Sequence, residues 1–158
     1  MGTKKKPQRQ LSPEATSPKS DRGDVLLISS KPDPRPVLLA TERDSKQIEA
    51  ILSAYHLHDI EQADRNLQAM AGDPHHRRQL ADILPILLDS ISRTADPDQA
   101  LNHWERLFGE VTRSSFLDYL RSSPRMLDLL CTIFGNSDAL AFTVIRDPML
   151  VYWLSEEA

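Results

Sequence analysis

The sequence has a single cysteine and no long apolar run, and both absences narrow the class of protein. Cys131 is the only cysteine among 158 residues, so the chain has neither a disulfide framework nor a thiolate metal cluster, which agrees with a reducing compartment. The longest apolar stretches, such as residues 25–28 and 37–40, are too short to cross a bilayer, and the lysines at 4–6 are not followed by the hydrophobic region of a signal peptide. We therefore expect a cytoplasmic protein with no membrane partner.

The first forty residues differ in composition from the rest. Residues 1–40 contain six of the eleven prolines, and residues 1–22 hold six Lys or Arg against two acidic residues, so this stretch carries +4 and the remainder −8. We predict a disordered Pro/Lys/Ser-rich leader over 1–40 and a folded domain over 41–158. Residues 24–30 are compatible with a short strand or with a peptide that docks on a partner. The basic tail has no interleaved aromatic residues, so we do not expect a nucleic-acid partner.

From Thr41 onward, apolar residues recur at helical spacing. The first set follows i, i+3, i+4 and i+7 and consists of Ile48, Ile51, Leu52 and Tyr55. Thr41 or Asp44 can cap this helix, because a side-chain oxygen there accepts a hydrogen bond from an unpaired backbone N–H of the first turn. A second helix is predicted over 59–70, and it ends in the Ala-Gly-Asp-Pro sequence of residues 71–74.

A third helix begins at Pro74 and carries the most apolar stretch of the chain. Pro85 inside it removes a backbone donor, which predicts either a kink or two shorter helices. Beyond residue 96, turns of Asp, Ser or Pro recur, and each precedes a short helix with apolar residues on one side. These helices are predicted over 97–109, 114–122, 124–134, 138–146 and 148–155. Because no strand pattern accompanies them, we predict an all-α domain, an orthogonal helical array or bundle of about eight short helices.

Acidic residues and the cysteine do not form a catalytic pattern. Asp96 and Asp98 are an Asp-x-Asp pair, but Pro97 and the apolar periodicity after it favour cap and first-turn positions of a helix over a metal site. Residues 135–140 are similar to the Gly-Ser-Asp-x-Asp signature of nucleotidyltransferases, but Leu140 stands where the second carboxylate belongs. Capping of the next helix is the better interpretation. Cys131 lies among apolar residues and is expected in the core.

The five histidines are not spaced as metal ligands on one helix face. The closest groups are His56 with His58 and His75 with His76, whose separations of two and one differ from the i, i+4 spacing of helical zinc ligands. His103 lies inside a predicted helix, where packing or capping is the more common role. We therefore predict no catalytic, cofactor-binding or metal-binding residue in this chain.

Three motifs follow one another between residues 96 and 154. The first is DPDQALN at 96–102 with ERLF at 105–108. The second is a proline at 124, a leucine-rich helix and FGNS at 134–137, and the third is DPML at 147–150 with WL at 153–154. In this order and spacing they resemble the N-terminal helical region of the glutamine synthetase (glutamate-ammonia ligase) adenylyltransferase/adenylyl-removing enzyme family, which shows DPD-x-AL-x-x-x-ER, FG-x-S and DP-x-L-x-x-WL.

The resemblance implies a role in the regulation of nitrogen metabolism. Members of this family transfer AMP from ATP to a tyrosine of glutamine synthetase, and many also remove it. ATP and Mg are implied as cofactors only of the nucleotidyltransferase domain that follows the helical region in the family. The catalytic motif of that domain, a Gly-Ser turn followed by an Asp-x-Asp pair that would hold magnesium ions against the triphosphate, is not found in this sequence. We therefore expect a truncated or split protein that is inactive alone.

Two hypotheses about function follow. In the first, the chain is a non-catalytic helical scaffold segment whose partner is glutamine synthetase or a separate nucleotidyltransferase chain. In the second, it is a stand-alone helical protein-interaction module. Tyr152 and Trp153 form the candidate partner-docking surface, because these large side chains near residue 158 would be exposed if a following domain normally covers them.

Overall fold

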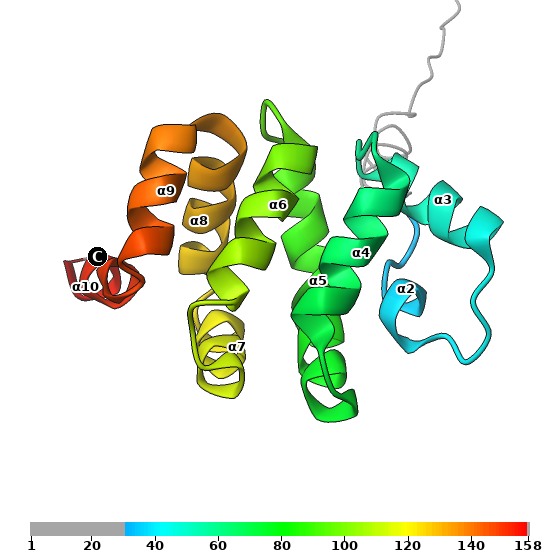
Figure 1. The fold of residues 1–158 in the computed structure, drawn as a ribbon, viewed down its shortest axis with the longest axis horizontal. Helices are drawn as coiled ribbons and strands as arrows, with labels where there is room; N and C mark the ends of the chain where they lie inside the picture. The colour runs from blue at the N-terminus through cyan, green and yellow to red at the C-terminus, as the bar shows by residue number, and fades with distance from the viewer. Residues whose placement is uncertain (1–30, 158) are drawn as a thin grey trace, which may run out of the picture. The chain divides into compact units, whose positions relative to one another are not determined.

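The described part of the chain is an array of α-helices. The computed structural model describes residues 31–157, within which it contains nine helices and no strand (Figure 1). Their bounds are α2 (Pro36–Leu39), α3 (Ser45–Ala54), α4 (Ile60–Ala71), α5 (Pro74–Ser92), α6 (Pro97–Phe108), α7 (Arg113–Ser122), α8 (Pro124–Asn136), α9 (Asp138–Arg146) and α10 (Met149–Glu157). The all-α fold predicted from the sequence is confirmed.

The helices follow one another across the array. α6 packs against α4 on one side and α8 on the other, and α5 packs against α7 and α8. In Figure 1, α2 and α3 lie at one end of the row and α9 and α10 at the opposite end. The middle of the row is therefore covered on several sides, whereas the two ends are covered on fewer.

One apolar core runs through the array, and its largest member is Trp104 of α6. The Trp104 side chain is fully buried, and its ring centroid lies 5.2 Å from that of Phe134 in α8 and 6.4 Å from that of Phe116 in α7. The apolar faces of these three helices meet at this point. Burial of aromatic side chains of this size is a main source of stability in a small domain.

Acidic and serine side chains set the starts of most of these helices. In each case the side-chain oxygen of the residue before the helix accepts a hydrogen bond from a backbone N–H of the first turn. The capping residues are Asp44 of α3, Asp59 of α4, Asp73 of α5, Asp96 of α6 and Ser137 of α9. Proline at the first helical position strengthens the starts of α5, α6 and α8.

Two local features resolve questions that the sequence left open. Pro85 lies inside α5, which continues as a single 19-residue helix rather than two shorter ones. Gly72 ends α4 with a φ of 64°, in the left-handed region that glycine adopts without steric strain. The predicted helix over 138–146 has the observed bounds of α9, and the other predicted bounds agree with the observed ones to within about two residues.

The helical unit begins earlier in the chain than the sequence indicated. Residues from Pro32 onward form one compact unit, whereas the predicted leader extended to residue 40. The missed part includes the short helix α2, with Val37 and Leu38 buried. The other residues of the predicted leader, 1–30, lie outside the described part of the chain. Among the described residues, no helix is long and apolar enough to cross a membrane.

Candidate functional site

The candidate docking surface predicted from the sequence lies on the last described helix, α10. Trp153 is 56% exposed and Met149, one helical turn earlier, is 68% exposed, so the two side chains share one outward face. In α9, Leu140 and Phe142 are also exposed. Four of the seven large apolar side chains that are exposed in the described part therefore lie between residues 140 and 153.

Tyr152 and Trp153 have different environments. The ring centroid of Tyr152 lies 4.9 Å from that of Tyr119 in α7, so this side chain helps to hold α10 against the array. Partial burial, together with Tyr119, raises the pKa of Tyr152. Trp153 points outward instead. Within the predicted pair, Trp153 with its neighbour Met149 presents apolar surface to solvent, and Tyr152 has mainly a packing role.

Two of the resemblance motifs meet where α6, α8 and α9 converge. The backbone N–H of Asp96 donates to the carbonyl of Gly135 at 3.0 Å, and the N–H of Ala95 donates to the side-chain oxygen of Asn136 at 3.0 Å. Gly135 approaches Thr94 so closely that a Cβ at this position would lie 2.1 Å from the Thr94 hydroxyl oxygen. The DPD and FGNS motifs are therefore two sides of one tight helix junction.

A buried histidine lies beside this junction. His103 of α6 is fully buried, and its Nε2 lies 3.1 Å from a carboxylate oxygen of Asp138 at the start of α9. The same Nε2 also lies 3.0 Å from the side-chain amide nitrogen of Gln99 in α6. The His103 ring packs edge-on against Phe142, at 5.3 Å between centroids. His103 therefore packs and links α6 to α9, as the sequence predicted for a histidine inside a helix.

The two aspartates of the DPD motif have separate structural partners. Asp96 caps α6 by accepting from the N–H of Gln99 at 3.0 Å, as predicted. Asp98 reaches across to the start of α4, where its carboxylate accepts from the backbone N–H of His58 at 3.0 Å. Sequence reasoning missed this second contact, because the partner lies 40 residues away in the chain.

The described residues bring together no group of three or more His, Cys, Asp or Glu side chains that could hold a metal ion. Cys131 is buried, as predicted, and burial raises the pKa of its thiol to about 12. A thiol with so high a pKa is a poor nucleophile at neutral pH. The prediction that the chain carries no catalytic residue stays a prediction.

One cavity lies between α3 and α4. Its volume is about 580 Å³, and Ile48 and Ile60 contribute apolar lining. Most of its polar lining is acidic, and the two basic groups that line it are Arg43 and His58. Arg43 is already paired with Asp64, at 2.5 Å. The cavity is open to solvent, and no buried polar side chain without a partner lines it.

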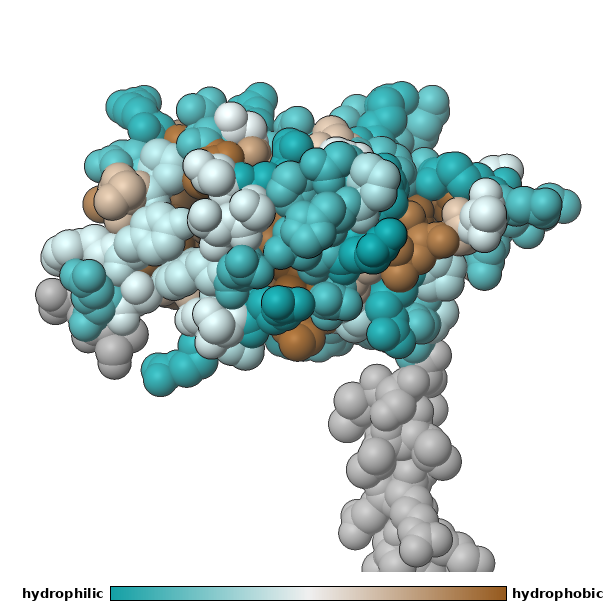
Figure 2. All heavy atoms as spheres, turned by 90° about the horizontal axis from the view of Figure 1, so that it is seen from below, coloured by the Kyte–Doolittle hydropathy of each residue, from teal (hydrophilic) through white to brown (hydrophobic). Residues whose placement is uncertain are grey.

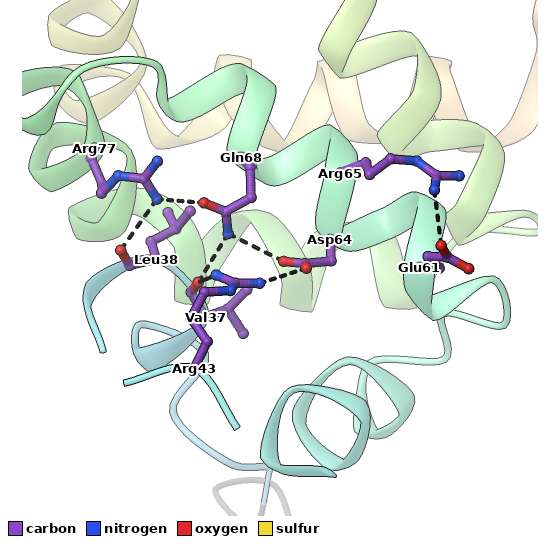
Figure 3. Close-up of polar contacts among 8 residues, drawn as sticks. All are labelled: Val37, Leu38, Arg43, Glu61, Asp64, Arg65, Gln68 and Arg77. Atoms are coloured by element: carbon purple, nitrogen blue, oxygen red, sulfur yellow. Dashed lines mark hydrogen bonds and ion pairs between the residues drawn. The ribbon is translucent and has the colours of Figure 1, made fainter. Parts of the chain in front are cut away.

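A polar network at the opposite end from α10 holds α2 in place, and Figure 3 shows it. The side-chain amide N–H of Gln68 in α4 donates to the carbonyl of Val37 at 3.1 Å, and Arg43 donates to the same carbonyl at 3.1 Å. Arg77 of α5 donates to the carbonyl of Leu38 at 3.3 Å and to the side-chain oxygen of Gln68 at 2.6 Å. We call this set, with Asp64, the α2 clasp.

The described residues form an all-α helical domain. The α2 clasp holds its N-terminal end, and its C-terminal end exposes the apolar side chains of α9 and α10. A bifunctional glutamine synthetase adenylyltransferase/adenylyl-removing enzyme of Bifidobacterium longum is 27% identical to the chain over 137 residues, which cover 84% of this chain and 12% of that protein. The protein of the same name from Xanthobacter autotrophicus is 33% identical over 82 residues, covering 52% of this chain and 8% of that protein. The resemblance predicted from the motifs is therefore confirmed, since the curated homologues of this chain are glutamine synthetase adenylyltransferases.

The extent of these matches defines what is shared. An alignment over 84% of the chain includes α3 to α7 wherever along the chain it lies. The chain spans only 8 to 12% of the length of these relatives. No protein-family model matches the chain, and no solved structure matches it. The shared part thus includes the helices α3 to α7 of the array.

Proposed function

We propose that this chain is a non-catalytic helical scaffold segment of a glutamine synthetase adenylyltransferase-like protein. AMP transfer would be carried out by a nucleotidyltransferase domain outside these residues, on the same or on a separate polypeptide. The observation that carries the proposal is the homology over 84% of the chain to enzymes with this activity. Because the chain spans only 12% of their length, the activity is assigned to the assembly and not to this segment.

The proposed contact surface consists of the exposed apolar side chains of α9 and α10, which are Leu140, Phe142, Met149 and Trp153, and we call it the α9–α10 face. Met149 and Trp153 are i, i+4 neighbours, the spacing with which one helix presents anchors to a partner. Tryptophan is also enriched among the residues that contribute most to binding energy at interfaces. We propose that glutamine synthetase or a nucleotidyltransferase chain covers this face, and that Trp153 is its central contact.

A stand-alone interaction module is the second candidate function, and the closed core favours it. Trp104, Phe116 and Phe134 are buried together, and α6 and α9 carry their own N-terminal caps. A unit of this kind has the features needed to fold without further chain. In this case the α9–α10 face would bind a partner unrelated to glutamine synthetase.

The test uses purified glutamine synthetase and the purified chain, with binding measured by biolayer interferometry. We expect saturable binding that the double variant Met149→Ser/Trp153→Ser loses and that Ile86→Ser, an equally exposed change on α5, retains. Binding that is equally strong for both variants would exclude the α9–α10 face as the contact. No binding by a folded wild-type chain would favour the independent module, if a separate nucleotidyltransferase chain also fails to bind.

A second assay addresses catalysis. The purified chain is incubated with labelled ATP, Mg and glutamine synthetase, and incorporation of AMP is followed. We expect no incorporation above the rate without the chain. Incorporation that depends on the chain would overturn the assignment of a non-catalytic role.

A further inference from the structure

The segment α2 is too short to be stable by its own helical hydrogen bonds. It has four residues, whereas isolated helices shorter than about 12 residues are marginal in water. Two of its four side chains, Val37 and Leu38, are buried at 1% and 4% exposure. Since α2 packs against α3, α4 and α5, its helical form depends on the groove that these helices provide.

The groove also recognises the end of α2. The last carbonyls of a helix have no partner within the helix and need donors from elsewhere. Those donors here are side chains outside α2, because Gln68 of α4 and Arg43 of the following connection donate to the carbonyl of Val37 and Arg77 of α5 donates to that of Leu38. The α2 clasp therefore binds backbone carbonyl groups, which any short helical turn would present at its C-terminal end.

The clasp is held in shape by its own contacts. Gln68 donates to Asp64 at 3.1 Å and accepts from Arg77 at 2.6 Å, which fixes its amide between α4 and α5 (Figure 3). Asp64 in turn accepts from Arg43 at 2.5 Å. Of these groups, Gln68, Asp64 and Arg77 belong to α4 and α5, so most of the recognition surface does not depend on α2.

The chain that follows α2 makes few contacts of its own. Residues 41–47 are all exposed, and Arg43 is the side chain among them that joins the clasp. Before α2, the hydroxyl of Tyr55 donates to the carbonyl of Pro32 at 2.6 Å. The segment 32–39 therefore lies on the array with an exposed connection on its C-terminal side, the arrangement expected of a segment that can leave as a unit.

We propose that the groove formed by α3, α4 and α5 under α2 is a peptide-recognition site, which this chain fills with its own residues 36–39. Its ligand class is a short helical turn with two consecutive aliphatic side chains and free C-terminal carbonyls. The occupant seen in the structure defines this chemistry. A partner peptide of the same kind competes with α2, which is present at an effective concentration on the order of millimolar because it is tethered.

The test weakens the binding of α2 in the groove by mutation and supplies the same segment as a separate peptide. The variant Val37→Ser/Leu38→Ser weakens the hold of α2 while α4 and α5 keep their residues. A fluorescein-labelled peptide of residues 32–41 with blocked ends is the probe, and binding is measured by fluorescence anisotropy. We expect the variant to bind the peptide at least about tenfold more tightly than the wild-type chain, because the tethered competitor is weakened.

Two controls make the result specific. A peptide with serine at positions 37 and 38 should not bind either protein, and Arg77→Met in the Val37→Ser/Leu38→Ser background should weaken binding of the aliphatic peptide several-fold. The helical circular dichroism of each variant is recorded, and Leu38→Ala replaces the double variant if the latter unfolds.

The proposal is overturned by any of three results. They are equal peptide affinity for the wild-type chain and a folded variant, equal affinity for the aliphatic and serine peptides, and unfolding of both the Val37→Ser/Leu38→Ser and the Leu38→Ala variants. The last result would mean that α2 is an inseparable part of the core. Because no experiment here involves glutamine synthetase, failure of the scaffold proposal leaves these outcomes unaffected.

Discussion

The two ends of the helical array differ in how far their apolar side chains are buried. At the α2 end, polar side chains of α4 and α5 donate to the C-terminal carbonyls of α2, and the aliphatic residues of α2 are buried. At the α10 end, Met149 and Trp153 face solvent. The space-filling view in Figure 2 shows a face on which hydrophilic residues dominate and hydrophobic ones form separate patches. One end is therefore closed by the chain itself, whereas the other exposes the apolar surface that we propose a partner covers.

The largest expected effect is at the closed end. Leu38→Ala should weaken the docking of α2 by about 2–4 kcal/mol, because it removes a buried side chain. Hydrogen exchange should show the amides of α2 exchanging roughly a hundredfold faster, with much smaller changes in α6. An equal acceleration of exchange in α6 and α8 would contradict the separate docking of α2, since α2 would then be part of the central core.

A change in the middle of the array tests what the motif residues do. Gly135→Ala should lower the free energy of unfolding by about 1–3 kcal/mol, because the new methyl group would overlap the Thr94 side chain. Urea unfolding of the variant measures the loss. Gly109→Ala is the control, since its Cβ would meet only a backbone carbonyl at 3.3 Å. Equal losses for the two variants would mean that the close approach at Gly135 is not what the motif requires.

A smaller effect is expected when the clasp loses one donor. Arg77→Met should cost about 1–2 kcal/mol of α2 docking, because the carbonyl of Leu38 and the amide oxygen of Gln68 lose their donor. Hydrogen exchange of α2 amides measures this as well. The neighbouring exposed Arg78 provides the matched control, and Arg78→Met should leave exchange unchanged. If both variants behave alike, side-chain recognition of the carbonyls does not hold α2.

Local signals in the sequence predicted most of the fold. Asp-Pro and Ser-Pro pairs marked helix starts, because a capping side chain and a proline at the first helical position act within one turn. The start of α6 at Pro97 and that of α8 at Pro124 were found in this way. By contrast, α2 was missed, because prolines at 32, 34 and 36 favour an extended leader and only tertiary contacts make the segment helical.

The parts of the candidate sites that depend on distant residues could not be predicted. Gln68 and Arg77 look like ordinary surface residues of two helices, and nothing in their spacing shows that they meet the carbonyls of α2. The contact of Asp98 with the backbone of His58 is a similar case. The exposed position of Trp153 also follows from the orientation of α10, whereas sequence alone gave Tyr152 and Trp153 the same role.

The smallest expected change in stability is at the open end, and it comes with a clear optical signal. Trp153→Ser should alter the free energy of unfolding by no more than about 0.5 kcal/mol, because the side chain is 56% exposed. The chain has two tryptophans, so the variant retains only the fully buried Trp104. Its fluorescence should therefore be blue-shifted and protected from acrylamide, whereas the wild-type chain has a readily quenched component. A partner that covers the α9–α10 face should remove that component, and a loss of several kcal/mol on substitution would instead show that Trp153 belongs to the core.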